Sequence, residues 1–175
     1  MSATPGGDGG RRARGLRTLL TLSCAVAVVV VDQVTKTIAV DHLQGGPVHV
    51  LGPLSFSLAY NTGMAFSIGS GLAIPIALVV TVVVLFTLWI MRAVPSLSAS
   101  AALGLVLGGA IGNLGDRLLR NHGGAVVDFI ALKIWPTFNV ADASIVTGAA
   151  LLGIVYWRHG GARPSETGAE DARGG

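Results

Sequence analysis

Five aspartates are the only carboxylates between the two ends of this 175-residue chain: Asp32, Asp41, Asp116, Asp128 and Asp142. All except Asp41 lie in or beside a long apolar segment, near the end that we expect to face outward. An ionisable side chain at membrane depth costs free energy and by default indicates a function. Because carboxylates carry out general acid–base chemistry, their clustering near one membrane face predicts a catalytic site.

Two of these aspartates have opposed surroundings. Asp128 lies in the apolar run 126–130, where desolvation raises the pKa of a carboxyl group. Asp142 lies in the first turn of a predicted helix, three residues after Asn139, and a helix N-terminus stabilises negative charge. If the two carboxylates meet, they share one proton and activate a water between them, as in aspartic proteases. The sequence leaves open whether they meet, and also whether Asp142 only caps its helix.

Other polar residues follow helical spacing. Asn113, Asp116 and Arg117 project to overlapping faces of one predicted helix. Asp32 and Lys36, four residues apart, share one face of another helix in the order that favours an ion pair. A pair of this kind more often holds a helix in place than takes part in catalysis, so both interpretations stay open.

Two other kinds of catalysis find little support. The four histidines lack the spacing of metal ligands, and no serine is paired with a histidine or lysine in a nucleophile motif. Cys24, the single cysteine, excludes an intramolecular disulfide and behaves as a small hydrophobe in the apolar run 19–31. A signal peptide processed at Cys24 is the alternative, but the apolar run continues past that residue. We expect no metal and no cofactor.

The elements that must position these residues are membrane helices. The chain is 51% hydrophobic and 12% charged, with a mean hydropathy of +0.68, whereas soluble domains carry about 25% charged residues. Crossing a bilayer takes about 20 residues. Four segments reach that length, at about 16–40, 71–91, 97–114 and 138–157. We therefore predict an all-α integral membrane fold with four transmembrane helices.

The third of these segments is rich in glycine, and a four-residue glycine spacing lets helices approach closely. The glycines are Gly104, Gly108, Gly109 and Gly112. Between the first two segments, apolar residues alternate from Val48 to Tyr60, which is strand periodicity. We expect a small extracytoplasmic β-sheet over about 46–66, with Asn61 in the turn that ends it.

Positive charge predicts the orientation. Eight Lys and Arg residues fall on one side of the four spans and four on the other, which favours both termini in the cytoplasm. We expect disordered cytoplasmic tails at 1–15 and 159–175 around one membrane domain at 16–158. The net charge of +3 and pI near 9.6 do not indicate nucleic-acid binding, because the basic residues form no single patch and aromatics are too few to stack bases.

Five short sequence blocks follow one another between about residues 30 and 155. They are DQVTK (32–36), YNTGMAFS (60–67), GGAIGNLGDR (108–117), VVDFI (126–130) and FNVAD (138–142). With four apolar spans, the chain resembles lipoprotein signal peptidase, also called signal peptidase II or prolipoprotein signal peptidase, in aspartyl peptidase family A8. It departs from the family pattern at Met64, at Gly115 and in a short loop at 131–137, and no aspartate or asparagine of the blocks is lost.

The resemblance implies a metal-free aspartic endopeptidase of the bacterial cell membrane. Its substrates are diacylglyceryl-modified prolipoproteins, cut before the lipid-bearing cysteine at the extracytoplasmic face. The catalytic dyad is implied at Asp128 and Asp142. The remaining family positions bind substrate or support the dyad: Asn61, Asn113, Arg117, Asn139, Asp32, Lys36 and Asp116. The expected partners are the lipidated precursor and membrane lipid, not nucleic acid, and the expected state is a monomer.

Two other classes of protein remain as alternatives. A small transporter or channel subunit would line a path with polar residues along several helices, but the segment 71–91 contains no charge and almost no polar residue. A non-catalytic scaffold that associates through the glycine-rich helix would explain the glycines. It would not explain the aspartates.

Overall fold

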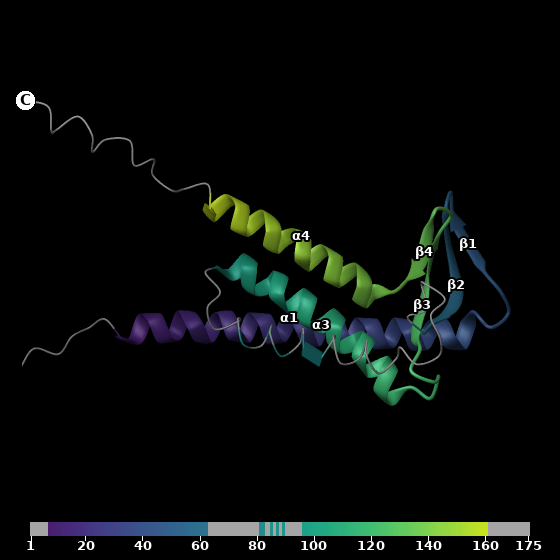
Figure 1. Cartoon of the computed structure of the whole chain (residues 1–175), viewed down its shortest axis with the longest axis horizontal. Helices are drawn as coiled ribbons and strands as arrows, with labels where there is room; N and C mark the ends of the chain where they lie inside the picture. Colours follow the sequence, from purple (N-terminus) through teal and green to yellow (C-terminus); the bar gives the residue numbers. More distant parts are fainter. Residues whose placement is uncertain are drawn as a thin grey trace, which may run out of the picture.

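The computed structural model describes residues 7–62 and 96–160, and residues 81, 82, 85, 87 and 89 between them. In chain order the elements are helix α1 (Gly7–His42), strands β1 (Val48–Leu51) and β2 (Leu54–Asn61), helix α3 (Leu97–Leu119), strands β3 (Val126–Leu132) and β4 (Trp135–Phe138), and helix α4 (Val140–Gly160). The three helices lie side by side, and the strands gather at the end of the bundle where α1 ends and α4 begins (Figure 1).

The prediction of an all-α fold with four transmembrane helices is wrong. The described part of the chain forms three helices and a four-stranded antiparallel sheet, and three helices are long and apolar enough to cross a membrane. The expected span at 71–91 lies almost entirely outside the described residues. Hydropathy detects spanning helices, but it does not detect a sheet assembled from two separate connections.

The sheet draws on both connections. β1 and β2 lie within the segment expected to form strands, at 46–66, of which residues 63–66 lie outside the described part. The segment 131–137, expected as a loop, instead belongs to the β3–β4 hairpin. The strand order is β1-β2-β3-β4, and Ala59 of β2 pairs with Asp128 of β3. The pairing of β2 with β3 therefore brings the first connection beside Asp128.

The helices differ in extent from their hydropathy segments. α1 begins at Gly7 rather than near residue 16, and so includes most of the tail expected to be disordered at 1–15. Its 36 residues make it about 54 Å long, well over the about 30 Å of a bilayer core. α3 continues to Leu119 rather than ending near residue 114, and α4 occupies Val140–Gly160 rather than about 138–157. The longer α3 keeps Asp116 and Arg117 in regular helix.

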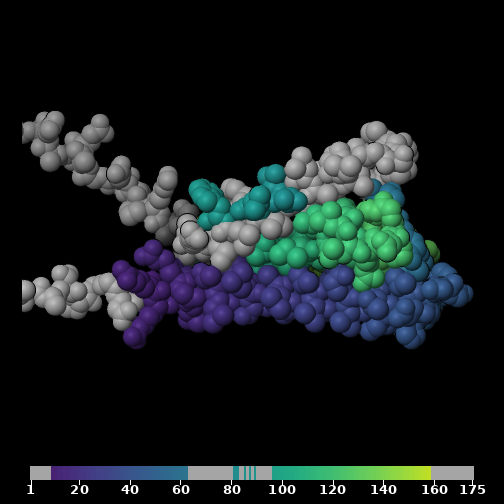
Figure 2. Space-filling view, turned by 90° about the horizontal axis from the view of Figure 1, so that it is seen from below, coloured from purple at the N-terminus to yellow at the C-terminus, as the bar shows by residue number. Residues whose placement is uncertain are grey.

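Helix α3 is the central packing element. It packs against both α1 and α4, and Figure 2 shows it lying along α1, which extends along the length of that face. An added Cβ on Gly108 would lie 2.6 Å from the Ala25 carbonyl oxygen of α1, and one on Gly109 would overlap the Ala141 carbonyl oxygen of α4. The prediction that these glycines permit close helix approach is confirmed.

Substituting alanine for Gly109 tests this packing. Because the Ala141 backbone cannot yield without moving α4, we expect Gly109→Ala to lower the free energy of unfolding by about 1–3 kcal/mol. Gly115→Ala is the matched control on the same helix, since an added Cβ there meets nothing within 4 Å. Unfolding of both variants in detergent measures the effect, and equal stability of the two would refute the packing argument.

Candidate active site

Asp128 and Asp142 are joined through one residue, Asn139. The Asn139 side-chain Nδ2 donates to Asp128 Oδ1 at 2.7 Å. Its Oδ1 accepts from the Asp142 backbone N–H at 2.9 Å, and its own N–H donates to Asp142 Oδ2 at 3.3 Å. This reciprocal pair is a helix-capping box in which Asn139 is the cap and Asp142 the third residue of α4. Asp142 therefore does help to cap the helix, and the same cap binds the Asp128 carboxylate.

Two further asparagines complete the hydrogen bonding of the two carboxylates. Asn61, the last residue of β2, donates from Nδ2 to Asp128 Oδ2 at 3.0 Å. Asn113 of α3 donates from Nδ2 to Asp142 Oδ1 at 2.7 Å. Asp128 is 2% exposed and Asn139 is fully buried. Each carboxylate is thus held by two nitrogen donors, and Asp128 is almost fully buried.

A buried ion-pair layer lies beneath the asparagines. Lys36 Nζ is 2.8 Å from Asp32 Oδ2 and 2.9 Å from Asp116 Oδ2, and all three side chains are 0% exposed. Lys36 also donates to Asn113 Oδ1 at 3.0 Å. Since that oxygen also accepts from Asn139 Nδ2 at 3.2 Å, the Asn113 amide is oriented with its N–H groups toward Asp142.

The two aspartates of this layer also fix backbone. Asp32 Oδ1 accepts from the Ala141 N–H at the start of α4, at 2.9 Å. Asp116 Oδ2 accepts from the Val127 N–H, next to Asp128, at 3.0 Å. The layer therefore links α1 and α3 to the two elements that carry Asp128 and Asp142.

The guanidinium group of Arg117 lies near the carboxylates and uses only part of its hydrogen-bonding capacity. One of its terminal nitrogens donates to the Asn113 carbonyl oxygen at 3.2 Å. Its Nε is buried and has no hydrogen-bond partner among the described residues. Its positive charge is attracted by Asp142, Asp116 and Asp128, in that order. Arg117 thus adds positive charge near Asp142.

All nine residues singled out from the sequence lie in this single network, and their catalytic and supporting roles stay predictions. Two members of it were missed. Gln33 Nε2 donates to Asp116 Oδ1 at 3.0 Å, and Arg120 Nε lies 3.1 Å from the same oxygen. A sequence signal existed for both, because Gln33 belongs to the DQVTK block and Arg120 follows Asp116 at the four-residue spacing of helical ion pairs.

The surroundings of Asp128 raise its pKa, as the apolar run 126–130 predicts. The pKa of Asp128 is raised from 3.8 to about 6, mainly by burial and to a smaller extent by the negative charge of Asp142. Hydrogen bonds from Asn61 and Asn139 and the charge of Lys36 lower this pKa in part. Asp142 instead lies in the first turn of α4, near the positive charge of Arg117. Asp128 is therefore the member better suited to hold a proton.

The raised pKa of Asp128 makes a stability prediction. The folded state binds this proton more tightly than the unfolded state, so Asp128 lowers stability as pH rises from about 4 to about 6 and has no further effect above. A pKa of about 6 in place of 3.8 corresponds to about 3 kcal/mol of unfolding free energy. Between about pH 4 and pH 7.5, we expect the unfolding free energy of Asp128→Asn to increase relative to that of wild type by most of this amount. A difference that is independent of pH would contradict the raised pKa.

The Asp128 carboxylate faces a cavity of about 350 Å³. Its lining residues are Ala59, Tyr60, Asn61, Thr62, Asp128, Pro136 and Thr137. The cavity is open and both polar and apolar, and it is bounded by β2 and β4 on either side of Asp128. A peptide backbone has room here to reach the carboxylate. Within the described residues, no group of three or more His, Cys, Asp or Glu is placed to bind a metal ion.

The three apolar helices define a multi-pass membrane protein, and the two carboxylates joined through Asn139 form its candidate site. Comparisons with known proteins are more specific. Residues 24–158 match the family model described as Signal peptidase (SPase) II. The chain therefore belongs to the signal peptidase II family, and it is a peptidase.

Named relatives and solved structures agree with this assignment. Lipoprotein signal peptidase of Mycobacterium tuberculosis (strain ATCC 25618 / H37Rv) is 44% identical over 144 residues, covering 79% of this chain and 71% of the relative. Lipoprotein signal peptidase of Mycobacterium avium (strain 104) is 42% identical over 158 residues, covering 87% of each chain. Two solved structures of bacterial membrane enzymes are similar, with TM-scores of 0.73 and 0.71 and identities of 28% and 31%. The matched regions cover 83% and 78% of this chain, and 92% and 91% of the chains in the two solved structures.

Proposed function

We propose that Asp128 and Asp142 are the catalytic pair with which this peptidase removes signal peptides from lipoproteins. The observation that carries the proposal is the position of Asn139, which binds both carboxylates at once. The pair combines one carboxyl whose pKa is raised to about 6 with one at a helix N-terminus. Such a difference assigns one member as acid and the other as base.

In the proposed reaction a water lies between the two carboxylates. Asp142 removes a proton from this water, and the water oxygen attacks the scissile carbonyl carbon. Protonated Asp128 donates its proton to the carbonyl oxygen. The tetrahedral intermediate then collapses. Asp142 gives its proton to the leaving nitrogen, the C–N bond breaks, and Asp128 recovers a proton from the intermediate's hydroxyl. Both carboxyl groups end in their starting states.

The surrounding residues act on this pair. Asn61 and Asn139 hold Asp128, and Asn113 holds Asp142. Arg117 adds positive charge beside Asp142. Asp32, Lys36 and Asp116 are positioning residues, since they fix Asn113 and the backbone at Val127 and Ala141.

The substrate and the topology belong to the same proposal. The substrates are diacylglyceryl-modified prolipoproteins, cut before the lipidated cysteine, whose acyl chains stay in the membrane. Both termini lie in the cytoplasm, and the site faces the extracytoplasmic side of a bacterial membrane, where the sheet closes over it and water enters. The active form is a monomer.

A cleavage assay tests the function. The purified full-length protein in lipid nanodiscs is mixed with a precursor peptide that carries a diacylglyceryl-cysteine, and the products are identified by mass spectrometry. We expect a mature product that begins at the lipidated cysteine, with a rate unchanged by EDTA. Cleavage at another bond, or loss of activity with EDTA, would contradict the proposal.

A further inference from the structure

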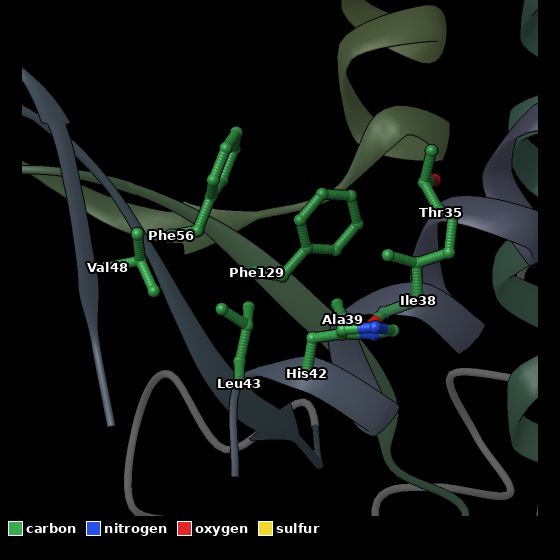
Figure 3. A pocket seen from close by; sticks show the side chains of 8 residues that line it. All are labelled: Thr35, Ile38, Ala39, His42, Leu43, Val48, Phe56 and Phe129. Carbon is green, nitrogen blue, oxygen red and sulfur yellow. The ribbon is translucent and has the colours of Figure 1, made fainter. Parts of the chain in front are cut away.

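A second cavity, of about 410 Å³, lies between the last turns of α1 and the sheet. It is lined by Thr35, Ile38, Ala39, His42, Leu43, Val48, Phe56 and Phe129. In Figure 3 the α1 side chains form one wall and Val48 of β1 the opposite wall. The rings of Phe56 and Phe129 lie between these walls, with centroids 6.3 Å apart. This volume is typical of small-ligand sites, which span about 300–1,000 Å³.

Two polar atoms of the lining are bound within α1. Thr35 Oγ1 donates to the Val31 carbonyl oxygen at 2.8 Å, within its own helix. His42 Nδ1 lies 3.0 Å from the Ile38 carbonyl oxygen. The remaining lining side chains are hydrocarbon. Since apolar cavities do not hold water and bind apolar ligands instead, the complementary ligand is a hydrocarbon chain.

The cavity continues the outward-facing apolar surface of α1. Val30, Val34 and Ile38 are 54%, 52% and 53% exposed and recur at helical spacing. In a membrane-spanning helix such a stripe faces lipid. Ile38, which belongs to this stripe, and Val48, which is 51% exposed, both line the cavity. The occupant therefore enters from the bilayer.

The cavity is separate from the catalytic pair. Phe129 lines it, whereas the preceding residue, Asp128, faces the other cavity with Asn61. Consecutive residues of a strand point to opposite faces of the sheet. Strand β3 thus stands between this cavity and the scissile bond, which favours a lipid of the bilayer over the acyl chains of a bound substrate.

We propose that this cavity holds one acyl chain of a bilayer phospholipid, which fills the space between α1 and the sheet. The chain packs against Phe56 and Phe129 and so supports the two strands that carry Asn61 and Asp128. This lipid site is independent of the proposed function, since retention of a lipid requires no cleavage.

Filling the cavity tests the site. Ala39 is 5% exposed and lines the cavity. In Ala39→Phe the new ring therefore occupies the space of several acyl-chain methylenes. Each methylene that leaves the cavity lowers the affinity for the lipid about fourfold. The full-length protein is purified with phosphatidylglycerol, and native mass spectrometry counts the lipid retained. We expect one bound lipid for wild type and at least about a tenfold loss for Ala39→Phe. Val146→Phe, on a residue of α4 that is 69% exposed, is the control and retains the lipid.

Two additions keep the test decisive. Val48→Trp fills the cavity from the strand side and replaces Ala39→Phe if that variant does not fold. Photolabelling compares a phosphatidylglycerol with an acyl-chain diazirine and a diacylglyceryl peptide with the same group. Labelling of Leu43 or Phe129 peptides by the phospholipid supports the proposal. Equal lipid retention by all folded variants, or labelling by the diacylglyceryl peptide alone, would overturn it.

Discussion

Replacing either Asp128 or Asp142 with asparagine is expected to reduce the turnover of a lipidated precursor by about 10³-fold or more. Asparagine preserves the size of each side chain but cannot exchange a proton. The losses of turnover should not add in the double variant, because neither carboxyl group supports the reaction without the other. Turnover in nanodiscs measures the effect.

The control for this pair is Asp41→Asn. Asp41 is exposed near the end of α1 and has no place in the network, so its variant should retain wild-type turnover. Circular dichroism and the pH-dependent unfolding described above show whether the site variants are folded. If folded Asp128→Asn or Asp142→Asn kept near wild-type turnover, the assignment of the catalytic pair would be wrong.

Removing the charge of Lys36 is expected to have the largest effect on stability. Lys36 is fully buried, with Asp32 at 2.8 Å and Asp116 at 2.9 Å. Asp116 retains Arg120 when Lys36 is lost, but Asp32 becomes a buried carboxylate without a countercharge. Breaking a buried pair in this way costs about 3–5 kcal/mol. We expect Lys36→Met to lower the free energy of unfolding in detergent by that amount.

A second substitution separates the charge effect from a packing effect. Asp32→Asn in the Lys36→Met background removes the uncompensated charge, so the double variant should be more stable than Lys36→Met alone. Lys133→Met, on an exposed lysine of the β3–β4 turn, should stay within about 0.5 kcal/mol of wild type. A loss of less than about 1 kcal/mol for Lys36→Met would show that the buried network does not support the fold.

Local spacing predicted the parts of this site that lie on single helices. Asp32 with Lys36, and Asn113 with Asp116, are three or four residues apart, and helical geometry places such pairs on one face. The apolar run around Asp128 likewise predicted a desolvated carboxyl, and its pKa is raised to about 6. These are short-range inferences that need no knowledge of the tertiary fold.

Contacts between distant segments could not be obtained in that way. Asn61 reaches Asp128 only because β2 pairs with β3 in a register that sets Ala59 opposite Asp128. No local pattern encodes the pairing of strands separated by a membrane helix, and the fold class was wrong for the same reason. The predicted end of helix α3, near residue 114, is too early. Hydropathy falls at the polar end of the helix, although Asp116 and Arg117 are helical.

The pH dependence of kcat/KM for cleavage of a lipidated precursor tests the central claim most directly, since it reports the acid and base of the free enzyme. Protonated Asp128 as the acid predicts a rate constant that falls above about pH 6, by about tenfold per pH unit. In Asn61→Ala this fall should begin at higher pH, because the lost hydrogen bond had lowered the pKa of Asp128. A rate constant that is flat between about pH 5 and pH 8 would contradict the assignment of Asp128 as the acid of an aspartate pair.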